Sequence, residues 1–251
     1  MHRFMVAQKI EDVGQELALP PEESVHAARV LRLKAGENVQ LLDGGALYQA
    51  ELTRVEGNQV EARVTALCPW PEPPAQAVLW QGLPKADKLE WIIQKATELG
   101  VWELWPVEMS RSIAKAEKGG KDDKKRERLS RIALEAAKQS GRAHVPEVRP
   151  ALSLSQALEA AERGGFDLLL VAWEEEQALP MSRAVREYCR QKGVPGRVLL
   201  VIGPEGGISP DEKARLSALG AISVTLGRRI LRTETAGLCA LSVLWAALEE
   251  M

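Results

Sequence analysis

The spacing of hydrophobic and polar residues changes after residue 67. Before it, short segments alternate apolar and polar side chains or are rich in β-branched residues, which is typical of half-buried strands. Turns with glycine at residues 43–45 and 56–59 predict hairpins. The expected strands cover residues 5–6, 37–42, 47–55 and 59–67, and one helix is expected over residues 22–32. This part therefore predicts a small β-barrel with a short helix.

From residue 77 onward, apolar runs and amphipathic stretches follow one another. The run at residues 197–202 lacks alternation, which is typical of a strand buried on both faces, and further strands are expected at residues 77–81, 101–109, 167–172 and 221–226. A helix is expected over residues 85–99, where the apolar stripe consists of Leu89, Ile92, Ile93, Ala96 and Leu99. Strands that alternate with helices predict an α/β fold with a parallel sheet.

A proline-rich segment separates the two patterns. Residues 68–74 contain four prolines, and proline can neither continue a helix nor donate a hydrogen bond to a sheet. We expect a stiff, extended linker there. The sequence therefore predicts two domains, residues 1–71 and residues 72–251.

A glycine-rich turn follows the apolar run at residues 197–202. It contains Gly203, Pro204, Gly206 and Gly207, and Ser209, Pro210 and Glu212 then predict the start of a helix with a capping box. Open α/β sheets bind small ligands at the carboxyl ends of parallel strands, where glycine lets the backbone approach the ligand. A tight turn without a ligand is the alternative. The chain has no G-x-G-x-x-G and no G-x-x-x-x-G-K-[ST] motif, so the sequence supports neither a dinucleotide fold nor a P-loop.

Composition narrows the class of protein. The chain has 33 Lys and Arg against 35 Asp and Glu, so a surface that binds nucleic acid must be local. Three isolated cysteines, Cys68, Cys189 and Cys239, predict no metal site and no disulfide framework, and they fit a reducing compartment. No basic leader followed by an apolar segment and no run of 18 apolar residues is present, so we expect a soluble, cytoplasmic protein outside the membrane.

Basic residues concentrate between residues 111 and 131, where nine Lys or Arg stand against four acids. Clustered cations on one helix face are typical of a surface that binds a phosphate backbone. The stripe at helical spacing consists of Lys121, Lys124, Arg128, Arg131, Lys138 and Arg142. A solvated helix with intrahelical ion pairs is the alternative. Residues 115–125 are expected to form a mobile loop that becomes ordered on RNA.

Two segments near the carboxyl end resemble the signature of a known family. They are Gly203-Pro204-Glu205-Gly206-Gly207 with Ser209 and Glu212, and Leu226-Gly227 with Arg229-Ile230-Leu231-Arg232-Thr233-Glu234-Thr235-Ala236. Weaker matches in the same order are His2-Arg3-Phe4, Val30-Leu31-Arg32, Gln94 to Gly100, Arg111-Ser112 and Gln139-Ser140-Gly141-Arg142. Together these segments resemble the RsmE-type 16S ribosomal RNA uridine-N3 methyltransferases.

The resemblance implies a SPOUT-class methyltransferase domain with a C-terminal trefoil knot, a PUA-like domain before it, and a homodimer. It implies that the cofactor is S-adenosyl-L-methionine and that the partner is 16S rRNA or the small ribosomal subunit. The implied cofactor residues are Leu200, Ile202, Gly203, Pro204, Glu205, Gly206, Leu226, Gly227, Ile230, Leu231, Thr233 and Thr235. The expected RNA contacts are Arg3, His26, Arg29, Arg32, Arg111, Arg128 and Arg142, although His26 taken alone favours an ordinary histidine on a helix surface.

Methylation of uridine N3 poses a particular chemical problem. The neutral ring nitrogen carries a proton, so a base, or a cation that stabilises the resulting anion, is required. Arg232 is expected to stabilise the anion, and Glu205 and Glu234 are candidates for the base or for orienting groups. Two alternatives remain open: a SPOUT methyltransferase that acts on tRNA, another base or a ribose, and a non-catalytic RNA-binding assembly factor.

The last helix is expected to begin at residues 233–235, and over residues 236–248 its side chains are apolar or aromatic apart from Ser242. A helix that is apolar all round must be covered all round. One stripe can pack on the sheet, and the other predicts contact with a second copy of the chain across a two-fold axis.

Overall fold

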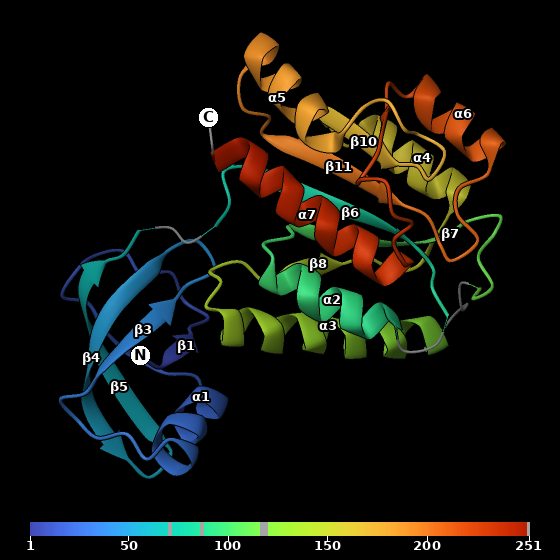
Figure 1. The fold of residues 1–251 in the computed structure, drawn as a ribbon. Helices are drawn as coiled ribbons and strands as arrows, with labels where there is room; N and C mark the ends of the chain where they lie inside the picture. Colours follow the sequence, from blue (N-terminus) through green and yellow to red (C-terminus); the bar gives the residue numbers. More distant parts are fainter. Residues whose placement is uncertain (70–71, 86–87, 116–119, 250–251) are drawn as a thin grey trace. The chain divides into compact units, whose positions relative to one another are not determined.

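The computed structural model describes residues 1–69, 72–85, 88–115 and 120–249 (Figure 1). The chain divides into two compact units. The first unit comprises Met1–Glu72 with Ala137–Val145, and the second comprises Pro73–Ala136 with Pro146–Met251. Residues 137–145 therefore belong with the amino-terminal unit, although the sequence placed them in the second domain.

The first unit is built on a five-stranded sheet in the order β1-β3-β4-β5-β2. Its strands are β1 (Arg3–Met5), β2 (Glu16–Ala18), β3 (Asn38–Leu42), β4 (Leu47–Glu56) and β5 (Gln59–Leu67). β1 pairs with β3 in parallel and the other pairs are antiparallel. Alternate residues such as Val39, Leu41 and Leu52 face a core that includes Phe4. The predicted hairpins are confirmed, whereas the three-residue strand β2 was not predicted.

The helical segment of the first unit is shorter than predicted. It consists of α1 (Pro21–Val25) and a π-helical turn η1 (His26–Val30). It ends before Arg32, whose φ of 55° lies in the left-handed region and cannot continue a helix.

A buried ion pair explains why residues 137–145 join the first unit. Arg142 donates to Glu72 Oε2 from Nε at 3.0 Å and from Nη2 at 2.5 Å, and the two side chains are 5% and 1% exposed. Glu72 Oε1 also accepts from the backbone N–H groups of Ala143 and His144 at 2.8 and 2.9 Å. Glu72, in the predicted linker, therefore holds residues 142–144 within this unit.

The second unit contains a seven-stranded parallel sheet in the order β12-β10-β11-β6-β7-β8, with β9 also paired to β7. The strands are β6 (Gln76–Gly82), β7 (Glu103–Glu108), β8 (Glu147–Val148), β9 (Leu152–Ser153), β10 (Leu168–Ala172), β11 (Arg197–Ile202) and β12 (Ile222–Val224). The α/β prediction is confirmed, and β11 has the predicted bounds.

Helices cover both faces of this sheet. They are α2 (Lys88–Glu98), α3 (Gly120–Ser140), α4 (Leu154–Arg163), α5 (Met181–Lys192), α6 (Pro210–Ala218) and α7 (Thr233–Glu249). Alternation along β6 separates the faces, because Trp80 packs with α4 and α6 residues, whereas Leu79 and Gln81 lie against Gly237 of α7. α7 lies between α2 and α5 (Figure 1).

One prediction about α3 is wrong. Residues 120–125, expected in a mobile loop, form the first turns of this helix. Residues 116–119 of the same prediction lie outside the described residues.

Candidate functional site

The glycine turn after β11 is packed tightly by the protein itself. A Cβ atom built on Gly203 would lie 2.8 Å from Ile208 Cγ1, and one on Gly206 would lie 2.8 Å from Arg111 Cβ. Real side chains do not make contacts this short, so both positions require glycine for packing. Both glycines therefore let the turn close, and their close approach to a ligand stays a prediction.

The predicted capping box at the start of α6 is confirmed. Ser209 Oγ accepts from the N–H of Glu212, and Glu212 Oε2 accepts from the N–H of Ser209 at 2.9 Å. Glu212 also accepts from the N–H of Ser110 at 2.7 Å. Burial would raise the pKa of Glu212, but hydrogen bonds from Ser110 and Ser209 lower that pKa below its usual value. The carboxylate therefore stays ionised and fixes the end of the turn.

A hydrogen-bond relay connects this turn to α7. Gln81, which is 1% exposed at the end of β6, donates from Nε2 to Thr233 Oγ1 at 2.7 Å. Thr233 Oγ1 in turn donates to the carbonyl of Gly203 at 2.6 Å. The sequence did not single out Gln81, because nothing in the apolar run at residues 77–81 indicates that its polar residue contacts Thr233. The relay brings the two signature segments together at the carboxyl edge of the sheet.

Thr233→Val is expected to reduce the free energy of unfolding by about 1–3 kcal/mol, because it leaves Gln81 Nε2 and the Gly203 carbonyl without their shared partner. Valine keeps the shape of threonine, so the loss isolates the hydroxyl. Chemical denaturation measures the effect. The control is Thr235→Val, at an exposed position one half-turn away; equal stability of the two variants would contradict the role of the relay.

Four charged residues lie beside the same edge. Lys88 Nζ lies 3.0 Å from Glu205 Oε1 and 3.2 Å from Glu234 Oε2. Glu205 Oε1 also accepts from the backbone N–H of Lys85 at 3.1 Å. Arg232 Nη1 is 3.9 Å from Glu234 Oε1, and its side chain is 84% exposed. All three predicted catalytic residues are therefore close together, and Lys88, which the sequence missed, lies between the two acids.

The remaining predicted cofactor residues differ in exposure. Leu200 and Ile202 are buried within β11, so their side chains support the turn. Ile230 is 91% exposed in the loop between β12 and α7. Gly227 in this loop has a φ of 118°, and apart from its chain neighbours no heavy atom of the described residues lies within 4 Å of the position a Cβ would take. The loop therefore offers an exposed apolar side chain and open backbone.

The predicted RNA contacts separate into surface and interior residues. His26, Arg29 and Arg32 are exposed on η1 and just after it. Arg3 is half-buried and donates to Gln40 Oε1 at 2.7 and 3.1 Å, and burial lowers the pKa of its guanidinium. Arg142 is buried against Glu72, so its prediction as a surface contact is wrong.

The two other predicted RNA contacts belong to the second unit. Arg111 donates to the carbonyl of Gly206 at 3.1 Å and thus borders the glycine turn. Arg128, which is 58% exposed, pairs with Glu90 of α2. Part of the basic stripe on α3 is therefore already neutralised by acids.

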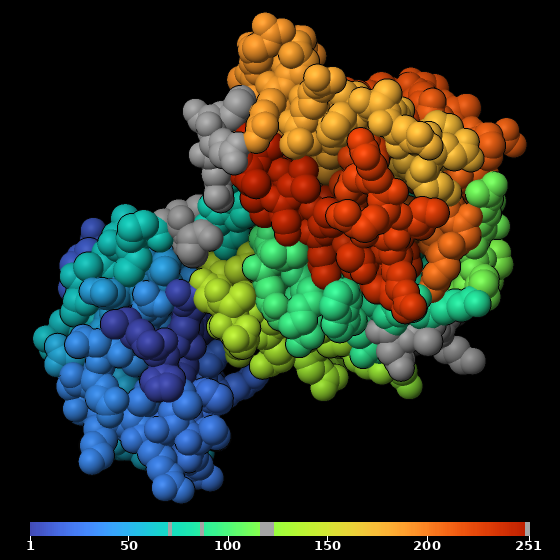
Figure 2. Space-filling view, in the orientation of Figure 1, coloured from blue at the N-terminus to red at the C-terminus, as the bar shows by residue number. Residues whose placement is uncertain are grey.

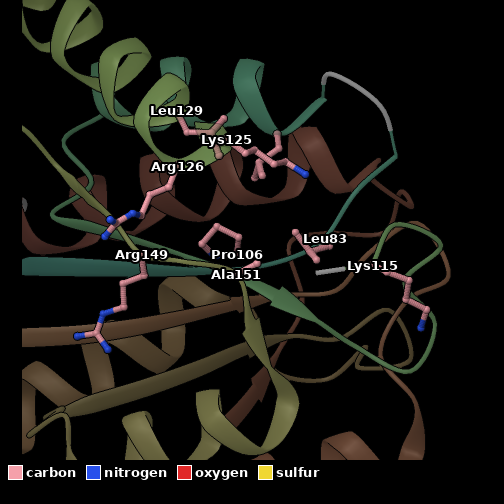
Figure 3. A pocket seen from close by; sticks show the side chains of 9 residues that line it. Leu83, Pro106, Lys115, Lys125, Arg126, Leu129, Arg149 and Ala151 are labelled. Carbon is pink, nitrogen blue, oxygen red and sulfur yellow. The ribbon is translucent and has the colours of Figure 1, made fainter. Parts of the chain in front are cut away.

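A shallow pocket lies between α2, α3 and β7 (Figure 3). It is lined by Leu83, Leu89, Pro106, Lys115, Lys125, Arg126, Leu129, Arg149 and Ala151. Figure 3 shows the charged ends of Lys115, Arg126 and Arg149 directed away from Leu83 and Pro106. These cations pair with Glu108, Asp123 and Glu103. No predicted cofactor residue lines the pocket, and we assign it no ligand.

Neither a metal centre nor a membrane-spanning helix is found in the part of the chain that the structure describes. Among these residues no group of three or more His, Cys, Asp or Glu side chains could hold a metal ion. None of the described helices is both long and apolar enough to cross a membrane.

The sheet, its glycine turn and the separate amino-terminal unit together match one class of protein. A family model described as an RNA methyltransferase domain matches residues 71–245, and a model described as an RNA methyltransferase PUA domain matches residues 19–65. The chain belongs to this RNA methyltransferase family.

Within the family, the similar proteins carry a more specific name. A curated relative from Bacillus subtilis, ribosomal RNA small subunit methyltransferase E, is 36% identical over 97% of this chain and 96% of its own length. The crystal structure of a ribosomal RNA small subunit methyltransferase E from Neisseria gonorrhoeae, bound to S-adenosyl methionine, has a TM-score of 0.81 at 31% identity and covers 98% of this chain and 97% of that one. A Legionella pneumophila protein in complex with the same cofactor has a TM-score of 0.73 at 32% identity, over 98% of this chain and 97% of that one.

Proposed function

We propose that the protein transfers the methyl group of S-adenosyl-L-methionine to N3 of a uridine in 16S rRNA of the small ribosomal subunit. The observation that carries the proposal is the meeting of the two signature segments, where Thr233 of α7 holds the carbonyl of Gly203 in the β11 turn. The names of the full-length relatives support the substrate, and the cofactor in the Neisseria structure supports the donor. A cytoplasmic location follows from the proposed substrate.

The residues present fit the proposed donor. Backbone groups of residues 203–207 and of the open Gly227 would hold its polar parts, while Leu226, Ile230 and Leu231 offer apolar surface that the chain leaves wholly or partly exposed. When bound, the donor supplies an electrophilic methyl group. Gln81 and Thr233 do not need to touch it, because they fix the backbone that does.

Arg232 is the proposed stabiliser of the anion that forms when uridine N3 loses its proton. Its side chain is 84% exposed just before α7, with Nη1 3.9 Å from Glu234 Oε1. A cation beside the developing charge lowers the barrier to such a step. Glu205 and Glu234 serve as candidates for the base or for orienting groups.

We also propose that the protein is a dimer through α7. Ser242 and Ala246 are exposed, and Leu238, Cys239 and Val243 are half-buried, on the side of α7 that does not pack on the sheet. Figure 2 shows this helix reaching the surface between α2 and α5. The small residues on this face suit close approach of a second helix. Sedimentation at micromolar concentration would reveal a monomer if the proposal is wrong. The trefoil knot stays a prediction.

RNA is proposed to bind the exposed residues His26, Arg29 and Arg32, with Arg111 and Arg128 as contacts of the second unit. Arg29→Gln with Arg32→Gln is expected to lower the slope of log affinity against log salt by roughly 0.7–0.9 for each lost phosphate contact. The matched control is Arg54→Gln with Arg63→Gln, which removes two exposed cations of β4 and β5. Equal slopes for the two double variants would exclude the η1 surface.

The decisive experiment is nucleoside mass spectrometry on small ribosomal subunits from a deletion strain, before and after incubation with the protein and S-adenosylmethionine. N3-methyluridine should appear only after incubation. Methyl groups on another base, on ribose or on tRNA would favour a different methyltransferase. Calorimetry that detects no donor binding would favour the non-catalytic assembly factor.

A further inference from the structure

Lys88 makes contacts that join three segments far apart in the chain. Its ammonium group reaches Glu205 in the β11 turn at 3.0 Å and Glu234 at the start of α7 at 3.2 Å. The preceding Lys85 adds a backbone N–H to Glu205 at 3.1 Å. The start of α2 is thus tied to both signature segments.

The bridge is partly shielded from water. The side chains of Lys88, Glu205 and Glu234 are 33%, 25% and 16% exposed. The other cation near these acids, Arg232, is 84% exposed and lies 3.9 Å from Glu234. Because solvent weakens exposed pairs most, the contacts of Lys88 hold the two acids more firmly than Arg232 does.

We propose that Lys88 is a positioning residue for methyl transfer: by bridging Glu205 and Glu234 it fixes the β11 turn relative to the start of α7. This inference rests on the proposed function and assigns a role to a residue that the signature segments do not contain. Lys88 touches neither donor nor RNA in this role. It acts on the two carboxylates.

The bridge also changes the chemistry available to the acids. Burial would raise the pKa of each carboxyl, but contacts with Lys88 and with backbone N–H groups lower the pKa of both Glu205 and Glu234 below the usual value. A carboxylate with a lowered pKa and a lysine on its oxygen is a poor acceptor for the uridine proton. Both acids therefore orient the site, and Arg232 is left to stabilise the anion.

Without Lys88, the carboxylates of Glu205 and Glu234 should repel each other. Two ionised carboxylates without their shared cation repel, and such a pair takes up a proton more readily than a single carboxyl does. The turn and the start of α7 would move apart while both are ionised. A misplacement of about 1 Å in an active site can reduce the rate on the order of 100-fold.

The test compares Lys88→Met with Lys95→Met. Lys95 lies on the same helix, with a side chain 35% exposed and 2.7 Å from Glu98, so the control removes a similar ion pair away from the turn. Lys88→Met is expected to reduce the single-turnover rate on small subunits at saturating donor about 100-fold. The control should stay within threefold of wild type, roughly the cost of one surface ion pair.

Calorimetry with S-adenosylmethionine supplies a readout that does not require catalysis. In wild type, Glu205 and Glu234 take up protons and release Lys88 only when the pH falls below their lowered pKa values. The affinity of wild type for the donor should therefore not change between pH 5 and 8. In Lys88→Met a shared proton can replace the lysine at low pH. We expect affinity about tenfold below wild type at pH 8 that recovers toward pH 5.

Two further variants keep the proposal falsifiable if methionine at position 88 impairs folding. Lys88→Arg retains a cation and should preserve most of the donor affinity. Glu205→Gln added to Lys88→Met removes one repelling charge and should restore affinity at pH 8. No gain in the double variant, or a pH-independent loss in Lys88→Met, would overturn the positioning role. Wild-type protein that binds the donor but leaves the rRNA unmethylated would contradict the proposed function, while the calorimetric comparison still decides the role of Lys88.

Discussion

Glu72→Ala is expected to lower the free energy of unfolding of the first unit by about 3–5 kcal/mol. The variant leaves the Arg142 guanidinium buried without its carboxylate, and it removes the acceptor of the Ala143 and His144 N–H groups. A buried charge that loses its partner costs far more than an exposed one. Hydrogen exchange on peptides that cover residues 137–145 measures the loss within the full chain.

The control for this prediction is Glu16→Ala, which breaks the exposed pair with Arg63 on β2 and β5. It should change stability by less than about 1 kcal/mol. Glu72→Leu combined with Arg142→Met replaces both charges by apolar side chains and should recover most of the loss. Retained protection of residues 137–145 in Glu72→Ala would show that the pair does not hold this segment.

The sequence predicted the elements that have a pattern within a few consecutive residues, such as an apolar run or a capping box. The run Val198–Ile202 is buried on both faces in the centre of the sheet, and β11 has the predicted bounds. The capping box of Ser209 and Glu212 spans three residues and is likewise present. By contrast, β8 and β9 contain two residues each. Strands this short carry no periodicity that could reveal them.

Long-range contacts account for what the sequence could not show. Arg142 continues a basic helical stripe in the sequence, and only its partner 70 residues earlier makes it an interior residue. Lys88 and Glu205 are separated by 117 residues, so no spacing rule connects them. A Cβ on Gly203 would lie 2.8 Å from Ile208 Cγ1, a packing reason for glycine that the sequence did not show; its approach to a ligand stays a prediction. Contacts between residues far apart in the chain therefore decide the surroundings of these residues, and local spacing does not show them.

The second large effect is expected on the rate of methylation when Arg232 is replaced. Arg232→Met should reduce the single-turnover rate of uridine methylation by about 100- to 1,000-fold, the usual cost of removing one stabiliser of a developing anion. The side chain is 84% exposed and makes one long contact of 3.9 Å with Glu234. Its loss should therefore leave both stability and donor affinity close to wild type, so the effect is confined to the chemical step.

Two variants separate charge from geometry at this position. Arg232→Lys keeps a cation without the planar fork and should recover part of the rate. Arg228→Met removes an exposed arginine of the same loop and should stay close to wild type. In Arg232→Met the protein no longer stabilises the uridine anion. Because a higher pH deprotonates more of the uridine, the methylation rate of this variant should rise more with pH than that of wild type. If donor affinity falls as much as the rate does, Arg232 binds the donor and a different group must meet the uridine anion.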